Sequence, residues 1–267
     1  MYEAAYHRIR ADRAVEVCTL THAGELPPPW LAPGYVINLV CEGVADLWTR
    51  GVTHRVGPGH VVLANPGQLR AVTRRCTPRA TTRSLIVDER FFHRALRSRG
   101  HPRAGAFDRA TTESEPLRCA LIRLHARLAG HGRLAVDEAV EEVMNVVGRD
   151  VGRADNRRWP AHDGIRRVQA FLDEHLEHDV GIAALTAIAG ISRAHLIREF
   201  RRVLGVPPHQ YVIHARVRRG RALLAGGTTV AEAAAATGFF DQAHFARHFR
   251  RLVGVSAIAY KRAVCPG

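Results

Sequence analysis

The hydrophobic positions in the first half of the chain fall into short runs that are separated by turn residues. Between residues 33 and 87 these runs are GYVINLVCEG, VADLWTRG, HRVGPGHVVLANPG, QLRAVTRR and TTRSLIVD. Runs of this length that are rich in Val, Ile, Leu and Thr and bounded by Gly or Pro are typical of strands. The pattern therefore predicts antiparallel strands in a barrel or a sandwich.

The hydrophobic period becomes helical between Asp88 and about Gly152. Two apolar stripes repeat at the same intervals: Leu117, Leu121, Leu124 and Leu128, then Val136, Val140, Val143 and Val147. This spacing places each stripe on one face of an amphipathic helix, so residues 116–130 and 134–148 are predicted to form an antiparallel helix pair. The stripes would either cover the strands or form the seam of a homodimer, and the sequence leaves both possibilities open.

A polar and charged stretch, GRADNRRWPAHD at residues 152–163, separates these helices from the rest of the chain and has the composition of a linker. The chain has 267 residues and 46% hydrophobic content, which is enough for two domains with separate cores. We therefore predict an α+β protein with one domain in residues 1–152, a linker in 153–162 and an all-α domain in 163–267.

The all-α region opens with a helix, a tight turn and a second helix. Ile182–Ala189 is followed by Gly190, and Ser192 is placed to cap a helix over Arg193–Val203. This is the helix-turn-helix pattern, whose second helix can enter the major groove of DNA. A long helix over Pro207–Leu224 comes next.

The same pattern then recurs. Its parts are a capping box at Thr229 and Glu232, a turn at Gly238, and a cap at Asp241 before a helix over Gln242–Val253. The two second helices are similar in sequence: AHLIREFRRVLGV at 194–206 and AHFARHFRRLVGV at 243–255. A connecting helix of about 17 residues spans roughly 25 Å. The repeated helices are therefore predicted to lie about 34 Å apart, which is one turn of DNA.

Each repeated helix has an apolar and a basic face. Leu196, Phe200, Phe245 and Phe249 are predicted to face the core, whereas Arg198 and Arg247 point outward. Contacts with DNA phosphates are predicted at Ser192, Arg193, Arg201, Arg202, Arg250 and Arg251. Such contacts supply affinity and salt sensitivity but carry no sequence information.

The formal net charge of +14 favours a polyanionic partner, with nucleic acid ahead of a membrane. A GC-rich genome that favours Arg codons is an alternative source of part of this charge. Five cysteines, Cys18, Cys41, Cys76, Cys119 and Cys265, are odd in number and include no CxxC pair, which argues against a disulfide framework. No signal peptide or membrane span is recognisable, so we expect a cytoplasmic protein without a membrane partner.

Residues 163–262 resemble the DNA-binding domain of the AraC/XylS family of transcription regulators. The resemblance rests on ISRAHLIREFRRVLGVPPHQYVIHARVRRGRALLAGG and VAEAAAATGFFDQAHFARHFRRLVGVSAIAYKR, which occur in the family's order. It implies base-reading positions at Ala194, Ile197, Arg198, Gln242, Ala243, His244 and Arg247. Gly220 departs from the family pattern, which usually has a helix former there, and is expected to cost about 1 kcal/mol relative to Ala.

The first 160 residues resemble the family's sensing half more loosely, through YVINLVCEG and HRVGPGHVVLANPGQLRAV. The resemblance implies a cupin-like barrel that binds a small-molecule effector. Trp30, Tyr35, Trp48 and His60 are predicted to line its pocket, because such pockets combine aromatic walls with few polar groups. A metal-dependent cupin enzyme would need clustered ligands such as His-x-His, which the sequence lacks, so we expect no metal, no cofactor and no catalytic activity.

The predicted function is therefore transcription regulation through sequence-specific binding of double-stranded DNA under the control of a small molecule. Activation and contact with RNA polymerase are implied by the resemblance alone. One alternative is a cupin-type metal-dependent enzyme with a basic helical tail. Another is a thiol redox sensor in which Arg74 and Arg75 make Cys76 oxidisable. His244 and His248 have a spacing that can bind zinc, but no third ligand lies nearby in the sequence.

Overall fold

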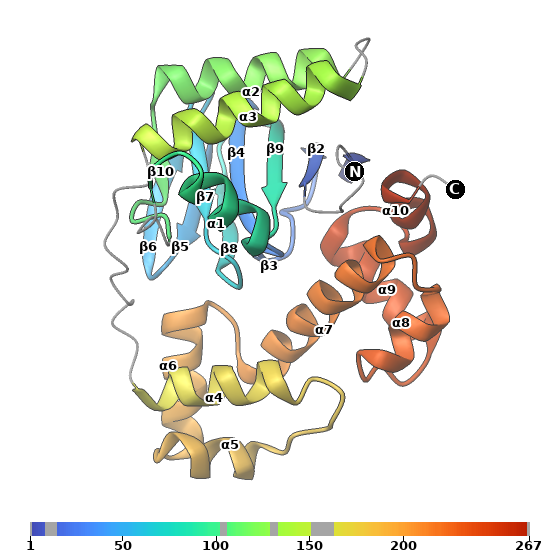
Figure 1. Ribbon diagram of the computed structural model, residues 1–267. Helices are drawn as coiled ribbons and strands as arrows, with labels where there is room; N and C mark the ends of the chain where they lie inside the picture. The colour runs from blue at the N-terminus through green and yellow to red at the C-terminus, as the bar shows by residue number, and fades with distance from the viewer. Residues whose placement is uncertain (1, 9–14, 102–105, 129–132, 151–162, 266–267) are drawn as a thin grey trace.

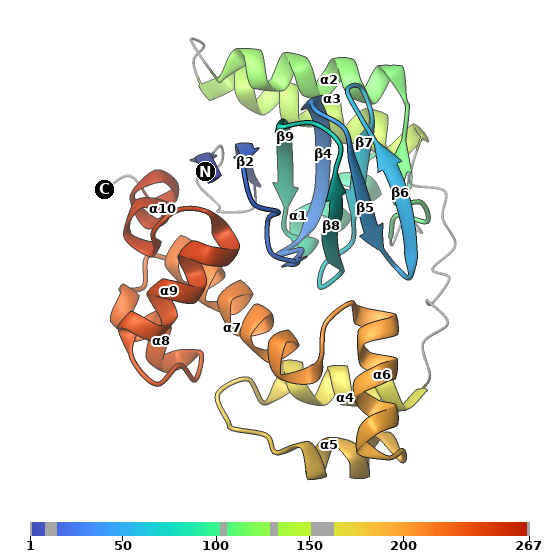
Figure 2. The ribbon, with the colours of Figure 1, turned by 180° about the vertical axis from the view of Figure 1, so that it is seen from behind.

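The computed structural model describes residues 2–8, 15–101, 106–128, 133–150 and 163–265. The described strands all lie in an N-terminal β-rich domain, and the C-terminal domain is helical (Figure 1). The α+β class predicted from the sequence is confirmed. Seen from both sides, helices α2 (Glu115–Arg127) and α3 (Arg133–Asp150) cross one end of the N-terminal domain, and the C-terminal domain lies at the other (Figure 2).

Two antiparallel sheets form the N-terminal domain. The first has the order β1-β2-β9-β4-β7-β10 and consists of Tyr2–Arg8, Val15–Ala23, Arg79–Val87, Tyr35–Glu42, Val61–Ala64 and Thr111–Thr112. The second has the order β3-β8-β5-β6 and consists of Trp30–Leu31, Leu69–Arg75, Ala45–Thr49 and Val52–Val56. Val40 and Val62 of the first sheet pack against Leu47 and Val56 of the second. The predicted strands are present, but the two sheets do not close into a continuous barrel.

Strands β1 and β2 precede the region in which the sequence predicts strands. β2 pairs with β9 over nine residues, from Val15 opposite Val87 to Ala23 opposite Arg79. Its inward residues Val15 and Val17 are fully buried. These strands are absent from the sequence prediction because their apolar runs are short. Pairing of β2 with β9, and of β1 with β2, stabilises them.

The helices of the N-terminal domain pack on the first sheet. α1 spans Glu89–Arg97 and is capped by Asp88, whose side chain accepts a hydrogen bond from the backbone N of Phe91. The two predicted stripes on α2 and α3 lie in the same core cluster as the sheet residues: Leu117, Leu121, Leu124, Val136, Val140, Val143 and Val147 are buried, and Leu128 is partly buried. Because this chain's own core covers these side chains, they do not form the dimer seam that the sequence left possible.

The C-terminal domain contains seven helices within its described residues. They are α4 (Asp163–Glu174), α5 (Ile182–Ala189), α6 (Arg193–Leu204), α7 (Pro208–Ala225), α8 (Val230–Ala236), α9 (Gln242–Val253) and α10 (Ala257–Val264). The capping box predicted at Thr229 and Glu232 is present. The predicted linker, residues 153–162, lies outside the described residues. None of the described helices combines the length and apolar character needed to span a bilayer.

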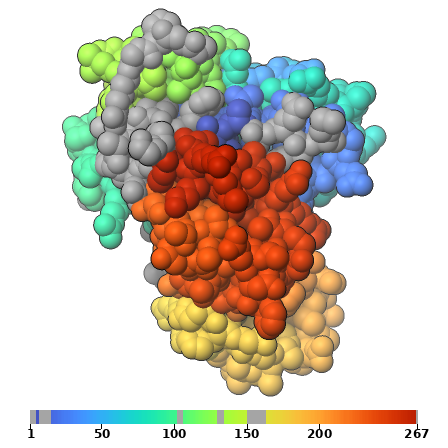
Figure 3. Space-filling model, turned by 90° about the vertical axis from the view of Figure 1, so that its right-hand side faces the viewer, coloured from blue at the N-terminus to red at the C-terminus, as the bar shows by residue number. Residues whose placement is uncertain are grey.

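Helix α7 connects two core clusters, each of which also includes buried residues of the N-terminal domain. Phe200 and Tyr211 belong to the core around α4–α6, whereas Phe245 and Tyr260 belong to the core around α8–α10. Gly220 of α7 has a packing reason, because a Cβ there would lie 2.5 Å from Cε2 of Phe245. Gly220 therefore lowers the helix propensity of α7, but its lack of a side chain allows close contact between α7 and α9. In space-filling view the red end of the chain, which includes α10, lies against the N-terminal domain (Figure 3), where α10 contacts β1.

Candidate nucleic-acid interface and an adjoining cavity

Helices α6 and α9 lie at opposite ends of α7, and each is the second helix of a helix-turn-helix unit (Figure 1, Figure 2). Ser192 caps α6 and Asp241 caps α9, each accepting a hydrogen bond from a backbone N–H in the first turn. The helices end at Gly205 and Gly254, whose φ angles are +74° and +92°. Because the same start and stop signals are used twice, both helices contain 12 residues. We call α6 and α9 the paired helices.

The outer faces of the paired helices carry the positions that the sequence assigns to base reading. Ala194, Arg198, Gln242, Ala243 and Arg247 are exposed, and Ile197 and His244 are half-buried. The opposite faces carry Leu196, Phe200, Phe245 and Phe249, each 0% exposed. The predicted division into a buried and an outer face is therefore confirmed.

Basic side chains surround the outer faces. Arg193, Arg201, Arg250 and Arg251 are exposed. Arg202 is also exposed, and its Nη2 donates to Oε2 of Glu199 at 2.7 Å. An exposed ion pair of this kind contributes at most about 1 kcal/mol, so Arg202 can exchange Glu199 for a phosphate at little cost. The Ser192 hydroxyl accepts the capping hydrogen bond and keeps its own proton as a donor.

His244 and His248 meet on α9, where their Nε2 atoms lie 3.1 Å apart. In this contact one ring donates a hydrogen bond and the other accepts it. Burial, followed by the neighbouring His244, lowers the pKa of His248. Within the described residues no group of three or more His, Cys, Asp or Glu side chains is placed to hold a metal ion.

The N-terminal domain contacts the C-terminal ends of both paired helices. Tyr6 of β1 donates a hydrogen bond to the carbonyl oxygen of Val253, the last residue of α9, at 2.8 Å. The ring of Trp48 from β5 lies so close to Gly205, after α6, that a Cβ there would overlap the ring. Both contacts are at helix ends, so the outer faces near the N-terminal ends of α6 and α9 remain uncovered.

A buried ion pair links α7 to the N-terminal domain. Nη2 of Arg221 lies 2.5 Å from Oε2 of Glu16 on β2, and Nε donates to the Tyr260 hydroxyl at 3.0 Å. That hydroxyl donates to Oε1 of Glu16 at 2.6 Å. The side chains of Arg221 and Glu16 are only 4% and 14% exposed. Burial lowers the pKa of Arg221, but the nearby groups, first Glu16 and then Tyr260, Tyr6 and Cys18, raise it, so its net pKa is raised and it stays charged.

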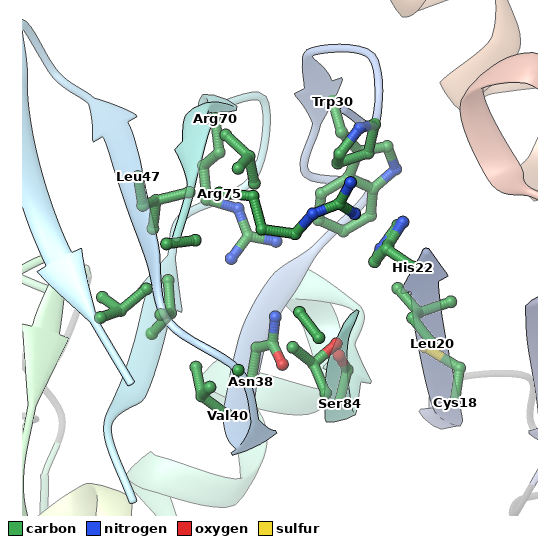
Figure 4. A pocket seen from close by; sticks show the side chains of 18 of the residues that line it. Cys18, Leu20, His22, Trp30, Asn38, Val40, Leu47, Arg70, Arg75 and Ser84 are labelled. Atoms are coloured by element: carbon green, nitrogen blue, oxygen red, sulfur yellow. The ribbon is translucent and has the colours of Figure 1, made fainter. Parts of the chain in front are cut away.

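A cavity of about 150 Å³ lies between the two sheets, next to this domain contact (Figure 4). Its apolar wall includes Leu20, Val40, Leu47, Val56, Val62, Val72 and Ile86. Its polar wall includes His22, Asn38, Arg70, Arg75, Thr82 and Ser84. No Asp or Glu of the described chain lines it. Leu252 of α9 also contributes to the wall, so the cavity touches both domains.

A β-bulge directs two arginines of β8 into this cavity. Asp46 of β5 is opposite Arg74, but the next residue, Leu47, is opposite Val72, which leaves Thr73 as an extra residue in β8. Without the bulge, residues 70 and 75 would face opposite sides of the sheet. The inserted residue reverses the alternation, so that both Arg70 and Arg75 line the cavity.

Burial changes the protonation chemistry of the cavity wall. Arg70 is 7% exposed, and burial lowers its pKa to about 10. Its guanidinium carbon lies 4.7 Å from the centre of the Trp30 ring, which is the paired residue on β3. Burial, followed by Arg75, lowers the pKa of His22 to about 4, so His22 is neutral near pH 7. The charges of the cavity wall are therefore positive only.

Family models match both parts of the chain. A model of the AraC-like ligand binding domain matches residues 22–145, and a model of a helix-turn-helix domain matches residues 185–263. The HTH-type transcriptional regulator YbfI of Bacillus subtilis is 25% identical over 215 residues, which are 79% of this chain and 78% of YbfI. The chain belongs to the AraC/XylS family of transcription regulators.

Other proteins match over a shorter stretch or by fold. The regulator MtrA of Neisseria gonorrhoeae is 34% identical over 96 residues, but these are only 32% of its length. ToxT from Vibrio cholerae, in its apo K231A form, has a similar fold with a TM-score of 0.53 at 12% identity, covering 98% of this chain and 97% of ToxT. A further ToxT structure, with a TM-score of 0.53 and 12% identity, contains a bound unsaturated fatty acid.

Only one of the four effector contacts predicted for this AraC/XylS family member lines the cavity, namely Trp30. Tyr35 instead stacks on Phe92 in the core, with ring centres 3.6 Å apart. Trp48 packs at the end of α6, and His60 lies at a different surface cleft with Nε2 3.1 Å from Oε1 of Glu113. These three predicted contacts are therefore wrong for this cavity.

The sequence prediction also missed Arg70 and Arg75, the two charged residues of the cavity. The QLRAVTRR segment was recognised as a strand, but its simple alternation does not place both arginines on one face. Cys76, the candidate redox thiol, is free and exposed next to this strand.

Proposed function

We propose that this AraC/XylS family regulator reads two consecutive segments of the major groove with its paired helices. The observation that carries the proposal is that one connector presents two outer faces of the same design, with Arg198 and Arg247 in equivalent exposed positions. The connector α7 has 18 residues, which corresponds to about 27 Å at 1.5 Å per residue. This length suits grooves that are about 34 Å apart, because each paired helix also extends beyond its junction with α7.

The contacts divide into those that read bases and those that bind the backbone. An Arg at 198 or 247 can form two hydrogen bonds to O6 and N7 of a guanine, and Ile197 can contact a thymine methyl. We assign the remaining base-facing positions to Ala194, Gln242, Ala243 and His244, which lie on the same outer faces. We assign phosphate contacts to Ser192, Arg193, Arg201, Arg202, Arg250 and Arg251.

We further propose that the cavity binds the effector. Support comes from its position, because Leu252 belongs both to the cavity wall and to the last turn of α9. A ligand in the cavity contacts this side chain and can change how the end of α9 rests on the N-terminal domain. The ToxT structure with a bound unsaturated fatty acid supports a small-molecule ligand in a protein of this fold.

The family resemblance implies activation of transcription, contact with RNA polymerase and pairing of two copies. We propose that this protein is a cytoplasmic regulator with these three properties. A homodimer would need a surface other than the buried stripes of α2 and α3. A reporter gene behind a bound promoter tests the sign of regulation. Lower reporter output after deletion of the gene for this protein supports activation, whereas higher output contradicts it.

Selection of bound sequences from a random DNA pool tests the paired-helix proposal. Arg198→Ala is expected to relax base preference in one half of the site, and Arg247→Ala about one DNA turn away, each by about 1–3 kcal/mol of discrimination. Arg201→Ala is the matched control, because loss of a phosphate contact weakens all sequences alike and lowers the salt slope by about one unit. If Arg198→Ala and Arg247→Ala alter the same base positions, or neither alters any, the two helices are not separate readers.

A further inference from the structure

The cavity contains buried positive charge without a compensating anion. Arg70 and Arg75 line it, and neither makes an ion pair with a carboxylate of the described chain. The buried charge of Arg70 is offset in part by the face of Trp30, which is a weak partner compared with a carboxylate. A buried cation left in this state is costly, so the structure favours binding of an anion at this place.

Unsatisfied hydrogen-bonding atoms gather at the same wall. Nε of Arg70, Nη1 of Arg75, Oδ1 of Asn38 and Oγ1 of Thr82 are buried and lack a hydrogen-bond partner within the described chain. Buried polar atoms are normally paired, so four such atoms around one cavity indicate a missing group. Water could satisfy hydrogen bonds here, but it would not neutralise the two guanidinium charges.

The rest of the cavity limits the size and polarity of that group. A cavity of about 150 Å³ is large enough for a benzene-sized body. Because most of its wall is aliphatic, a fully hydrated ion such as inorganic phosphate would leave apolar surface in contact with polar oxygens. A carboxylate on a small apolar body satisfies both walls, since its two oxygens match the planar fork of an arginine.

We propose that the effector is a small apolar carboxylic acid, of the size of a benzoate or a branched short-chain acid, whose carboxylate binds between Arg70 and Arg75. This inference rests on the proposed effector role of the cavity. Figure 4 shows both arginines directed into the space between the sheets, with Asn38 and Ser84 on the facing strands. The apolar body of the acid then lies among the aliphatic side chains and reaches Leu252.

Calorimetric titration of the full-length protein tests the proposal with benzoate and isovalerate as probes and with benzyl alcohol and isopentyl alcohol as their neutral counterparts. We expect at least one acid to bind, and the corresponding alcohol to bind at least tenfold more weakly. Arg75→Gln should weaken binding of the acid by about tenfold or more and leave binding of the alcohol unchanged. Arg75→Lys, which keeps the charge but not the planar fork, should restore part of the affinity.

Arg74→Gln is the matched control, because Arg74 is the exposed neighbour of Arg75 on the same strand. It should bind the acids as wild type does. The proposal is overturned if neither acid binds, if the alcohols bind as tightly as the acids, if Arg75→Gln and Arg74→Gln have equal effects, or if palmitate alone shows Arg75-dependent binding. Selection of bound DNA sequences with the same protein preparation, in the absence of acid, tests the proposed DNA binding separately. A failure to bind acid can therefore be distinguished from a failure to bind DNA.

Discussion

The ion pair between Glu16 and Arg221 predicts how tightly the two domains hold together. Glu16→Gln keeps the size of the side chain but removes the negative charge beside a guanidinium that is 4% exposed. Breaking a buried ion pair by removing one partner costs about 3–5 kcal/mol, because the other charge stays buried. The Tyr260 hydroxyl, which donates to Glu16 at 2.6 Å, also loses its charged acceptor.

The expected cost appears as separation of the domains. Glu16 belongs to the N-terminal domain and Arg221 to α7, so Arg221 regains water when the domains separate without either domain unfolding. A change of about 3 kcal/mol, the lower end of the range for buried pairs, shifts the equilibrium between docked and separated domains about a hundredfold. Small-angle scattering should show a larger radius of gyration for Glu16→Gln. Amide hydrogen exchange should rise in α10 and β1, which lie at the contact.

Two variants make this result interpretable. Glu42→Gln is the matched control, because Glu42 pairs with Arg79 at 3.6 Å and both side chains are more than half exposed. Such a pair contributes about 0–1 kcal/mol, so docking should be unchanged. The double variant Glu16→Leu with Arg221→Leu removes both charges and should recover part of the docking. If Glu16→Gln has the scattering and exchange behaviour of Glu42→Gln, the ion pair does not hold the domains together.

Two further predictions concern residues inside the C-terminal domain. Gly220→Ala should lower the thermal midpoint and the free energy of unfolding by about 1–3 kcal/mol, because its Cβ would lie 2.5 Å from Cε2 of Phe245. Gly181→Ser, in open space at the start of α5, should leave the midpoint unchanged or raise it slightly, and equal losses in both variants would contradict the packing argument. Burial, followed by Arg251 and His248, lowers the pKa of His214 from 6.5 to about 4. Between these pH values the unfolded chain therefore binds more protons than the folded chain. The free energy of unfolding should fall as the pH is lowered through this window. Urea unfolding at several pH values should show that His214→Gln reduces this slope by about 1.4 kcal/mol per pH unit, and an unchanged slope would contradict the assignment.

The C-terminal domain could be predicted from the sequence almost residue by residue. Its start and stop signals are local, because Ser192 and Asp241 cap their helices and Gly205 and Gly254 end them. The role of a glycine, however, cannot always be inferred from the local sequence. Gly220 looked like a weak position within a helix until the structure placed Phe245, 25 positions further along, against it.

The cavity between the two sheets could not be predicted in the same way, because non-local pairing determines it. The bulge at Thr73 depends on how β8 pairs with β5, and no local pattern in QLRAVTRR marks it. The aromatic residues were expected to line a pocket, but Tyr35 packs in the core and Trp48 packs at the contact between the domains. The two stripes of α2 and α3 had the right helical period, but periodicity alone cannot distinguish a chain's own core from a partner.

If the paired helices read DNA as proposed, the fixed order in which α7 joins them gives the bound site a direction. A two-fold symmetric dimer reads the same sequence from either end, so turning it around on DNA changes nothing. Here α6 comes before α7 and α9 comes after it on one polypeptide, and their outer faces differ at Ile197 and Ala246. Reversal therefore places each helix on the wrong half of the site. Each bound chain points one way along the duplex, and inversion of its site beside a promoter turns the N-terminal domain to the opposite side.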